Sequence, residues 1–192
     1  MLTDPWLQRW LPLVLERAGP GPVLEIGCGT GQDTATLVKA GARVVAFDLS
    51  PVSVAIARAR VPKADITCQD VRDPFPPLGP DVGAVIASLS LHYFSWAETE
   101  ALVARIRGVL RHGGLFLCRL NSTRDHNHGA SGYPEIEPNC FSVNGHPKRF
   151  FDRAAIERLF ADGWRKVSIE ELITHKYARP KVLWELALER DA

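Results

Sequence analysis

Several features that mark other protein classes are missing from this 192-residue sequence. No window approaches the roughly 18 consecutive apolar residues that a membrane-spanning helix needs, so we expect no membrane partner. Residues 1–6 lack the basic stretch and apolar core of a signal peptide. The four cysteines include no C-x-x-C pair. We therefore expect buried free thiols in a cytoplasmic protein rather than a disulfide framework.

The charge balance also lacks a bias toward either sign. The chain has 23 Lys and Arg against 22 Asp and Glu, a net charge of +1. Such a balance gives no reason to expect nucleic acid as a partner. The 46% hydrophobic and 23% charged fractions are close to those of soluble globular proteins. At this length we expect residues 1–192 to form a single domain.

Short apolar runs alternate with helical segments over the first two thirds of the chain. This alternation is typical of an α/β fold with a parallel sheet and helices on both faces. Runs that are apolar throughout suit strands that are buried on both faces. Strands are predicted at 23–26, 44–47, 66–69, 82–89, 115–120, 164–174 and 182–189, and helices at 32–39, 52–60 and from 95 to about 111.

Three segments fall outside this alternation. Residues 1–20 should form an N-terminal helix, begun by Asp4-Pro5 and limited or kinked by Pro12. The linker at 74–80 is too rich in proline for a full helix, so one face of the sheet should be partly open there. Residues 121–149 are polar over 29 positions, and we interpret them as a substrate-side loop or lid.

A glycine-rich turn follows the first predicted strand in the segment V-L-E-I-G-C-G-T-G. Gly27, Gly29 and Gly31 let the backbone turn sharply and approach a ligand closely. Asp48 ends the second strand 21 residues after Gly27, where a carboxylate can accept both ribose hydroxyls of an adenosine. Asp70 ends the third strand, where it could accept the adenine amino group. Three neighbouring strand ends therefore carry the groups that an adenosine cofactor needs.

The glycine spacing distinguishes between two cofactors that contain adenosine, NAD and S-adenosylmethionine. The dinucleotide fingerprint has a glycine at its sixth position, which here is Gln32. Glu25 precedes the loop, and an acid there would repel a pyrophosphate but suits the ammonium group of S-adenosylmethionine (SAM). The residues thus favour SAM over NAD, and an NAD-linked oxidoreductase is the weaker rival.

These segments resemble the motifs of class I SAM-dependent methyltransferases. The resemblance covers motif I at 23–34, motif II at 44–50, motif III at 69–71, and motif IV with its following loop at 81–94. It implies a three-layer Rossmann-like doubly wound sheet of seven strands in the order 3-2-1-4-5-7-6, with strand 7 antiparallel. The length of the chain is similar to the small-molecule, tellurite-resistance-like branch. Residues 81–88 do not resemble the D/N-P-P-Y/F motif, which disfavours methylation of exocyclic amines.

The resemblance also implies a set of cofactor-binding residues for SAM, with S-adenosylhomocysteine as the product. In this set Asp48 holds the ribose, while Asp70 and the Val71 amide hold the adenine. The full set is Glu25, Gly27, Cys28, Gly29, Gly31, Asp48, Leu49, Asp70, Val71 and Ser88.

Candidate acceptor-side residues follow the fourth and fifth predicted strands. In this family the loop that contains His92 borders the methyl group, so His92 is either a general base or part of the pocket wall. Arg119 lies in an otherwise apolar strand, where it is either a clamp for an anionic or polar acceptor or half of a salt bridge. The basic and aromatic segment 148–151 either faces the substrate or closes the lid. The predicted substrate-binding residues are Tyr93, Arg119, Asn121, Arg124 and His126.

We therefore predict a SAM-dependent methyltransferase that acts on a small-molecule acceptor, with an anionic acceptor as one option, mainly by proximity and orientation. Two alternatives stay open: an RNA or protein methyltransferase with the same cofactor site, and a non-catalytic SAM-binding protein. His126-x-His128 does not have the spacing of a standard zinc site, so no metal is expected. The oligomeric state is expected to be a monomer or a homodimer.

Overall fold

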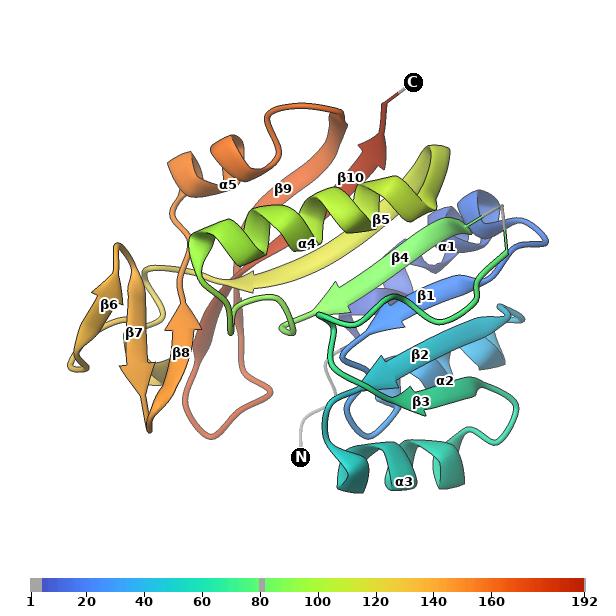
Figure 1. Cartoon of the computed structure of the whole chain (residues 1–192), viewed down its shortest axis with the longest axis horizontal. Helices are drawn as coiled ribbons and strands as arrows, with labels where there is room; N and C mark the ends of the chain where they lie inside the picture. Colours follow the sequence, from blue (N-terminus) through green and yellow to red (C-terminus); the bar gives the residue numbers. More distant parts are fainter. Residues whose placement is uncertain (1–4, 80–81, 192) are drawn as a thin grey trace.

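The computed structural model describes residues 5–79 and 82–191. A central sheet of seven strands runs through it (Figure 1). From one edge to the other the strands are β3 (Asp65–Cys68), β2 (Val44–Asp48), β1 (Val23–Ile26), β4 (Val82–Ser88), β5 (Leu110–Asn121), β10 (Lys181–Arg190) and β9 (Trp164–Thr174). β10 pairs antiparallel with both neighbours, and β1 to β5 pair in parallel. Because β9 and β10 are the sixth and seventh strands of this sheet along the chain, the predicted order 3-2-1-4-5-7-6 is confirmed.

Helices cover both faces of the sheet. They are α1 (Leu11–Ala18), α2 (Gln32–Lys39), α3 (Pro51–Arg60), α4 (Trp96–Val109) and α5 (Arg153–Leu159). α1, α2 and α3 bury Val14, Leu37 and Val54 on one face. α4 and α5 bury Ile106 and Ile156 on the other face (Figure 1). The result is the three-layer arrangement that alternating strands and helices predict.

Three helix starts are fixed by capping hydrogen bonds. The Ser50 side chain accepts a hydrogen bond from the Ser53 amide at 3.2 Å, and the Asp152 carboxylate accepts one from the Ala155 amide at 2.7 Å. Ser95 and Glu98 form a complete capping box at the start of α4. Each cap satisfies backbone N–H groups that have no partner inside the helix.

Two predicted boundaries are wrong. Pro12 lies in the first turn of α1, where its missing N–H costs nothing, and a 3₁₀ turn, η1 (Trp6–Trp10), precedes it. Asp4 lies outside the described residues. The helix predicted to run to about residue 111 ends at Val109, and Gly113 and Gly114 lie inside β5, which begins at Leu110 rather than at residue 115. A left-handed φ of 70° at Gly113 and the register shift opposite Val82 accommodate them there.

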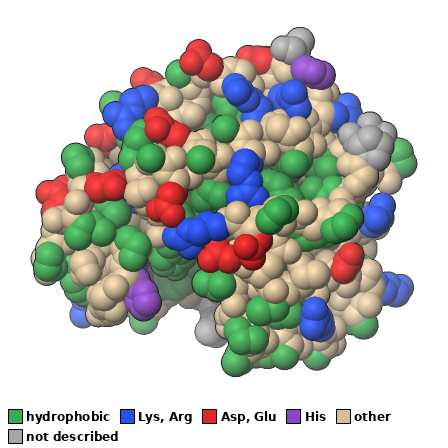
Figure 2. All heavy atoms as spheres, in the orientation of Figure 1, with side chains coloured by type: hydrophobic (Ala, Val, Ile, Leu, Met, Phe, Trp, Pro, Cys, Tyr) green, Lys and Arg blue, Asp and Glu red, His purple; other side chains and the backbone are tan. Residues whose placement is uncertain are grey.

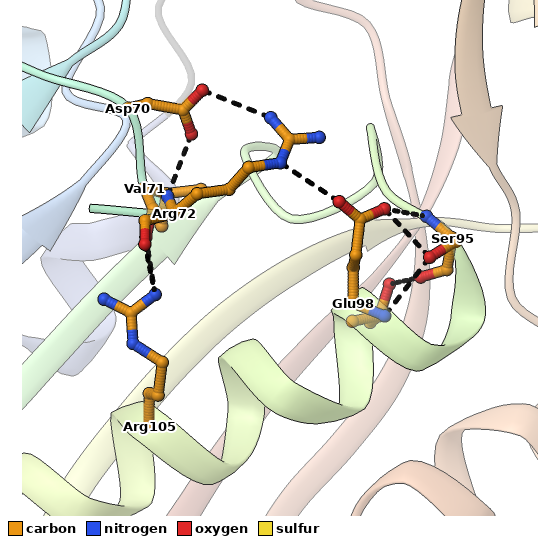
Figure 3. Close-up of polar contacts among 7 residues, drawn as sticks. Asp70, Val71, Arg72, Ser95, Glu98 and Arg105 are labelled. Carbon is orange, nitrogen blue, oxygen red and sulfur yellow. Dashed lines mark hydrogen bonds and ion pairs between the residues drawn. The ribbon is translucent and has the colours of Figure 1, made fainter. Parts of the chain in front are cut away.

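The linker between β3 and β4 contains no helix among its described residues, as predicted. Phe75 packs against the buried core there and Leu78 is part of it, so the sheet face is more covered than expected. Arg105 of α4 fixes the linker by donating hydrogen bonds to the carbonyls of Val71 and Arg72 at 2.9 and 3.2 Å (Figure 3). A groove of about 530 Å³ remains between the linker and α4.

The segment 121–149, predicted as a loop, contains a second small sheet. After a 3₁₀ turn, η2 (His126–His128), come β6 (Glu135–Glu137), β7 (Cys140–Val143) and β8 (His146–Arg149), which pair antiparallel in that order. Asn144-Gly145 joins β7 to β8 with φ of 53° and 81°, and Asn-Gly is a strong hairpin signal in a sequence. The small sheet lies beside the carboxyl end of β5 (Figure 1).

The four cysteines are all free, but their burial differs from expectation. Cys28, Cys118 and Cys140 are buried, whereas Cys68 at the end of the edge strand β3 is exposed. Among the described residues, no helix has the length and apolar character needed to cross a membrane.

Candidate functional site

Two adjoining cavities lie at the carboxyl ends of the parallel strands. The wide cavity, of about 780 Å³, is lined by residues that follow β1, β2, β3 and β4 and by the β7–β8 hairpin. The narrow cavity, of about 480 Å³, lies beside the glycine loop and extends to residues that precede β10. The two cavities share Gly27, Gly29, Leu89, Tyr93 and Lys148, so they form one continuous cleft. Figure 2 shows the surface hollowed between the small sheet on the left and the α3 side on the right.

In the glycine loop between β1 and α2, close contacts leave no room for a larger residue at two of the glycines. Gly27 has a φ of 73°, and a Cβ there would lie 2.4 Å from the Cβ of Ser90. Gly31 has a φ of 78°, and a Cβ there would lie 3.1 Å from Ala57 of α3. Gly31 therefore shapes the loop against α3 and does not line either cavity.

Asp48 is held at the carboxyl end of β2 by two backbone hydrogen bonds. Its Oδ2 accepts from the Gly29 amide at 2.8 Å, and its Oδ1 accepts from the Ser50 amide at 2.9 Å. The carboxylate thus links the glycine loop to the start of α3. A carboxylate has about four acceptor positions, so two remain for ligand hydroxyls in the wide cavity.

Asp70 belongs to a chain of charged contacts that ends on α4 (Figure 3). Its carboxylate accepts from the Arg72 amide at 2.9 Å and from the Arg72 guanidinium at 3.2 Å. Arg72 also donates to Glu98 at 3.0 Å and lies 4.8 Å from the ring centre of Phe94. Asp70, Val71, Arg72 and Phe94 all line the wide cavity. Arg72 was not among the residues predicted from the sequence. The sequence feature that marks it is its position two residues after Asp70.

Glu25 lies on β1 at the floor of the narrow cavity. Its side chain is buried and accepts a hydrogen bond from the Thr34 hydroxyl at 2.6 Å. Burial, with a smaller contribution from the charges of Asp33 and Asp48, raises the pKa of Glu25 to about 8. A cation bound in the cavity would favour the ionised carboxylate. The position is therefore suited to an ammonium group.

The loop after β4 supplies the wall shared by the two cavities. Leu89 has a φ of 57°, a left-handed conformation that is costly for a branched side chain and often occurs at functional sites. The Ser90 hydroxyl fixes the loop by donating to the Ile26 carbonyl at 2.7 Å. Tyr93 is 47% exposed and lines both cavities. The predicted residue Ser88 lines the narrow cavity.

His92 is buried in the same loop and lines the narrow cavity. Among the described residues its Nδ1 has no hydrogen-bond partner. Burial lowers the pKa of His92 well below its usual value, and the charges of Lys181 and Lys148 lower it further. The ring is therefore neutral near pH 7, which makes it a hydrogen-bonding group rather than a cation.

Arg119 on β5 lies at the inner end of the narrow cavity. Its Nε donates to the Ser88 hydroxyl at 3.0 Å, and its guanidinium lies 4.5 Å from the ring centre of Trp6. Glu185 of β10 is its partner in the strand register. The Arg119 side chain is therefore buried, held by neighbouring side chains and placed beside the cavity.

Three of the predicted substrate-binding residues do not line either cavity. Asn121 is buried and donates to the Arg149 carbonyl at 3.4 Å, so it ties β5 to the small sheet. Arg124 forms an ion pair with Glu171 with its side chain 67% exposed. His126 is exposed, and its neighbour two residues later, His128, lines the narrow cavity instead.

The narrow cavity contains further residues that sequence reasoning had not assigned as substrate-binding. They are Gln32, Asp33, His128, Lys148, Lys176, Tyr177 and Lys181. Lys148 belongs to the segment that was expected to face the substrate or close a lid. Lys176 and Tyr177 precede β10 and reach the cleft only because that strand inserts next to β5. Cys28 also lines this cavity, and burial raises the pKa of its thiol to about 12, so the thiol remains protonated.

Comparison with known proteins finds methyltransferases. A family model described as a methyltransferase domain matches residues 23–114. An uncharacterized methyltransferase from Synechocystis is 34% identical over 107 residues, which are 55% of this chain and 50% of that relative. An uncharacterized methyltransferase from Mycobacterium bovis is 32% identical over 169 residues, which are 88% of this chain and 64% of that protein. The match to the first relative therefore covers about half of its length.

Solved structures share the fold. A SAM-dependent methyltransferase from Methanosarcina mazei has a TM-score of 0.75 and 14% identity, over 94% of this chain and 97% of that one. The magnesium protoporphyrin IX methyltransferase from Synechocystis, solved with bound SAM, has a TM-score of 0.69 and 16% identity, over 97% of this chain and 78% of that one. The fold and the strand-end site define a Rossmann-like protein with an adenosine cleft. The match of residues 23–114 to a methyltransferase domain and this shared fold make the chain similar to class I SAM-dependent methyltransferases.

The cofactor of this superfamily is SAM, and the cleft residues fit it. Glu25 offers a buried carboxyl group whose ionisation needs a neighbouring cation. Asp48 offers acceptor positions at the end of the next strand, and Asp70 with Val71 lines the far end of the wide cavity. These groups match the ammonium, ribose and adenine of SAM in the order in which that molecule presents them.

Proposed function

We propose that this protein is an enzyme that transfers the methyl group of SAM to a small-molecule acceptor bound in the narrow cavity. The observation that carries the proposal is the row formed by Glu25, Asp48 and Asp70 on three neighbouring strand ends, all along one cleft. The narrow cavity extends beyond the Glu25 end of that row. It therefore leaves space for an acceptor next to the expected position of the methyl group.

The residues contribute mainly by positioning the two reactants. SAM supplies an electrophilic methyl group on a charged sulfur that is a good leaving group. Glu25 would hold the ammonium group of SAM and Asp48 its ribose, so the sulfur between them would be fixed. Tyr93 and His92 would form the wall against which the acceptor is placed. Correct orientation of two bound reactants can by itself supply about 7 to 11 kcal/mol of a barrier. His92 is neutral and beside the cavity, so it could accept a proton from a hydroxyl acceptor.

The small sheet formed by β6, β7 and β8 is proposed as the substrate-side lid within a single domain spanning residues 1–192. Val143, Asn144, His146 and Pro147 of its hairpin line the wide cavity opposite Asp48 and Asp70. A lid in this place would exclude water from the cofactor. The small-molecule, tellurite-resistance-like branch is part of the same proposal. The Synechocystis neighbour is named for the small molecule magnesium protoporphyrin IX, which is consistent with a small acceptor on this fold.

A cytoplasmic location and a monomeric or homodimeric state complete the proposal. Free thiols at all four cysteine positions are typical of a reducing compartment. Sedimentation of the purified chain would measure the oligomeric state directly.

The cofactor is tested by calorimetric titration with SAM, S-adenosylhomocysteine and NAD. We expect SAM and S-adenosylhomocysteine to bind, and their affinity to fall about 100-fold or more in Asp48→Asn. This substitution keeps the shape of the side chain but removes the charge that two ribose hydroxyls would share. Asp65→Asn is the matched control, because Asp65 is exposed at the start of β3. Binding of NAD, or no binding of SAM to the unmodified chain, would refute the proposal.

A further inference from the structure

The narrow cavity has more positive than negative groups. Four cationic side chains line it, namely Arg119, Lys148, Lys176 and Lys181, against the two acids Glu25 and Asp33. Glu25 is mainly protonated near pH 7 without a bound cation, since burial raises its pKa to about 8. The cavity as a whole therefore attracts anions.

The four cations are not equivalent. Lys181 is neutralised inside the protein, because its Nζ lies 2.6 Å from the carboxylate of Asp125 and both side chains are buried. Arg119 is held by Ser88 and Trp6. Lys148 and Lys176 differ because, within residues 5–79 and 82–191, no carboxylate lies within ion-pair distance of either Nζ, and of these two only Lys148 lines both cavities. A half-buried ammonium group with no carboxylate in direct contact can pair with an anion from outside the chain, while the charge of Asp125 acts on it at longer range.

Lys148 stands where the two cavities meet, since it lines both of them. Its Nζ donates to the His128 carbonyl at 2.6 Å and lies 5.6 Å from the ring centre of Phe150. These contacts hold the side chain in place but use only one of its three donors. The remaining two donors are available to a ligand in the cleft.

His92 provides a second unsatisfied group in the same cavity. It is only 3% exposed, and its Nδ1 has no partner among the described residues. A buried polar atom without a hydrogen bond is costly, so a ligand that supplies one would bind more tightly. Tyr93 and Tyr177 line this part of the cavity and give it aromatic walls.

Resting on the proposed methyltransferase function, we infer that the acceptor is a small organic acid whose carboxylate binds Lys148 and whose second polar group bonds to Nδ1 of His92. Nothing in the family match selects Lys148, which lies outside residues 23–114. The methionine carboxylate of SAM has the same chemistry and could also reach a cation in this cleft. The experiment therefore has to separate an acid acceptor from the cofactor.

The test measures binding of acids and their neutral amides to protein saturated with S-adenosylhomocysteine. The probes are benzoate and benzamide, salicylate and salicylamide, indole-3-acetate and indole-3-acetamide, and hexanoate and hexanamide. We expect at least one acid to bind about 10- to 100-fold more tightly than its amide, as a charged hydrogen bond predicts. We also expect that acid to shift the ¹⁵N signals of the His92 ring.

Two variants of Lys148 test its role, and one variant of Lys166 is the control. Lys148→Met should remove the preference for the acid and leave S-adenosylhomocysteine binding unchanged, whereas Lys148→Arg should keep the preference. Lys166→Met is the matched control, because Lys166 is exposed on β9. Thermal melts of each variant show whether it is folded.

Three results would overturn the inference. The first is that the unmodified protein binds no acid more tightly than its amide, and the second is that such a preference survives in Lys148→Met. The third is that Lys148→Met weakens S-adenosylhomocysteine binding, which would assign Lys148 to the cofactor carboxylate. If the unmodified protein fails to bind S-adenosylhomocysteine at all, the proposed function itself falls, and this inference falls with it.

Discussion

Glu25 shows how one buried carboxyl group can link cofactor binding to pH. Its pKa is raised by burial from 4.5 to about 8, so it carries a proton at neutral pH in the free protein. An ammonium group placed beside it favours the ionised form. Binding of SAM near pH 7 should therefore release close to one proton. Calorimetry in buffers of different ionisation enthalpy measures this number, and Glu25→Gln should bind more weakly and release no proton. Equal heats in all buffers would contradict this role.

The same residue should make the stability of the free protein depend on pH. Because the pKa of Glu25 is higher in the folded than in the unfolded chain, its contribution is complete below about pH 4.5 and is lost as the pH rises through 8. The unmodified protein should thus lose stability between pH 5.5 and 8.5 relative to Glu25→Gln. Urea unfolding at both pH values measures the difference. Parallel pH profiles of the two proteins would show that the carboxyl group is not desolvated.

Contacts between elements depend on small residues at single positions, and Gly83 on β4 is the tightest of them. A Cβ at Gly83 would lie 1.8 Å from the Arg17 carbonyl oxygen near the end of α1, which is backbone and cannot rotate away. Gly83→Ala should therefore push α1 from the sheet and destabilise the fold by about 2 kcal/mol or more. Gly108→Ala is the control, because that position on α4 has open space and alanine is the better helix former by about 1 kcal/mol. Chemical denaturation of both variants should give changes of opposite sign.

The small sheet depends on a buried arginine. Arg149 at the end of β8 donates to the Phe94 carbonyl at 3.1 Å and forms an ion pair with Glu137 of β6. Glu137 also accepts from the Trp96 amide at 3.0 Å, which fixes the start of α4. Arg149→Met should cost about 2 kcal/mol, because it removes the donor to the Phe94 carbonyl and the cation that pairs with Glu137. Hydrogen exchange should rise in residues 135–149 and remain unchanged in β1 and β2; a uniform rise would show that the small sheet unfolds only with the whole molecule.

At the scale of the whole molecule, the large sheet brings distant residues into one cleft. Glu25, Asp48 and Asp70 lie on strands whose order along the chain is also their order across the sheet, so their meeting could be predicted from the sequence. Lys148 and Lys181 reach the same cleft by other routes, one through the β7–β8 hairpin and one through the insertion of β10 next to β5. No local pattern in the sequence marks those routes.

The sequence by itself determined the fold class, the helix caps and the acidic residues at three strand ends, whereas the strand order came from the resemblance to class I SAM-dependent methyltransferases. It could do so because these features depend on local spacing: apolar runs, Ser-Pro and Ser-x-x-Glu caps, and an acid at the end of each of three consecutive strands. The sequence also contained the Asn144-Gly145 hairpin signal within a segment predicted as a loop.

Only the tertiary structure decided which side chains line the narrow cavity. Arg124 and His126 lie outside the cavities, whereas His128, Lys148 and Tyr177 line the narrow one. The physical reason is that the direction of a side chain in an irregular segment depends on contacts with elements far along the chain. Burial is also a property of the whole fold. Burial keeps Glu25 mainly protonated and His92 neutral near pH 7, and neither can be predicted from composition or residue spacing.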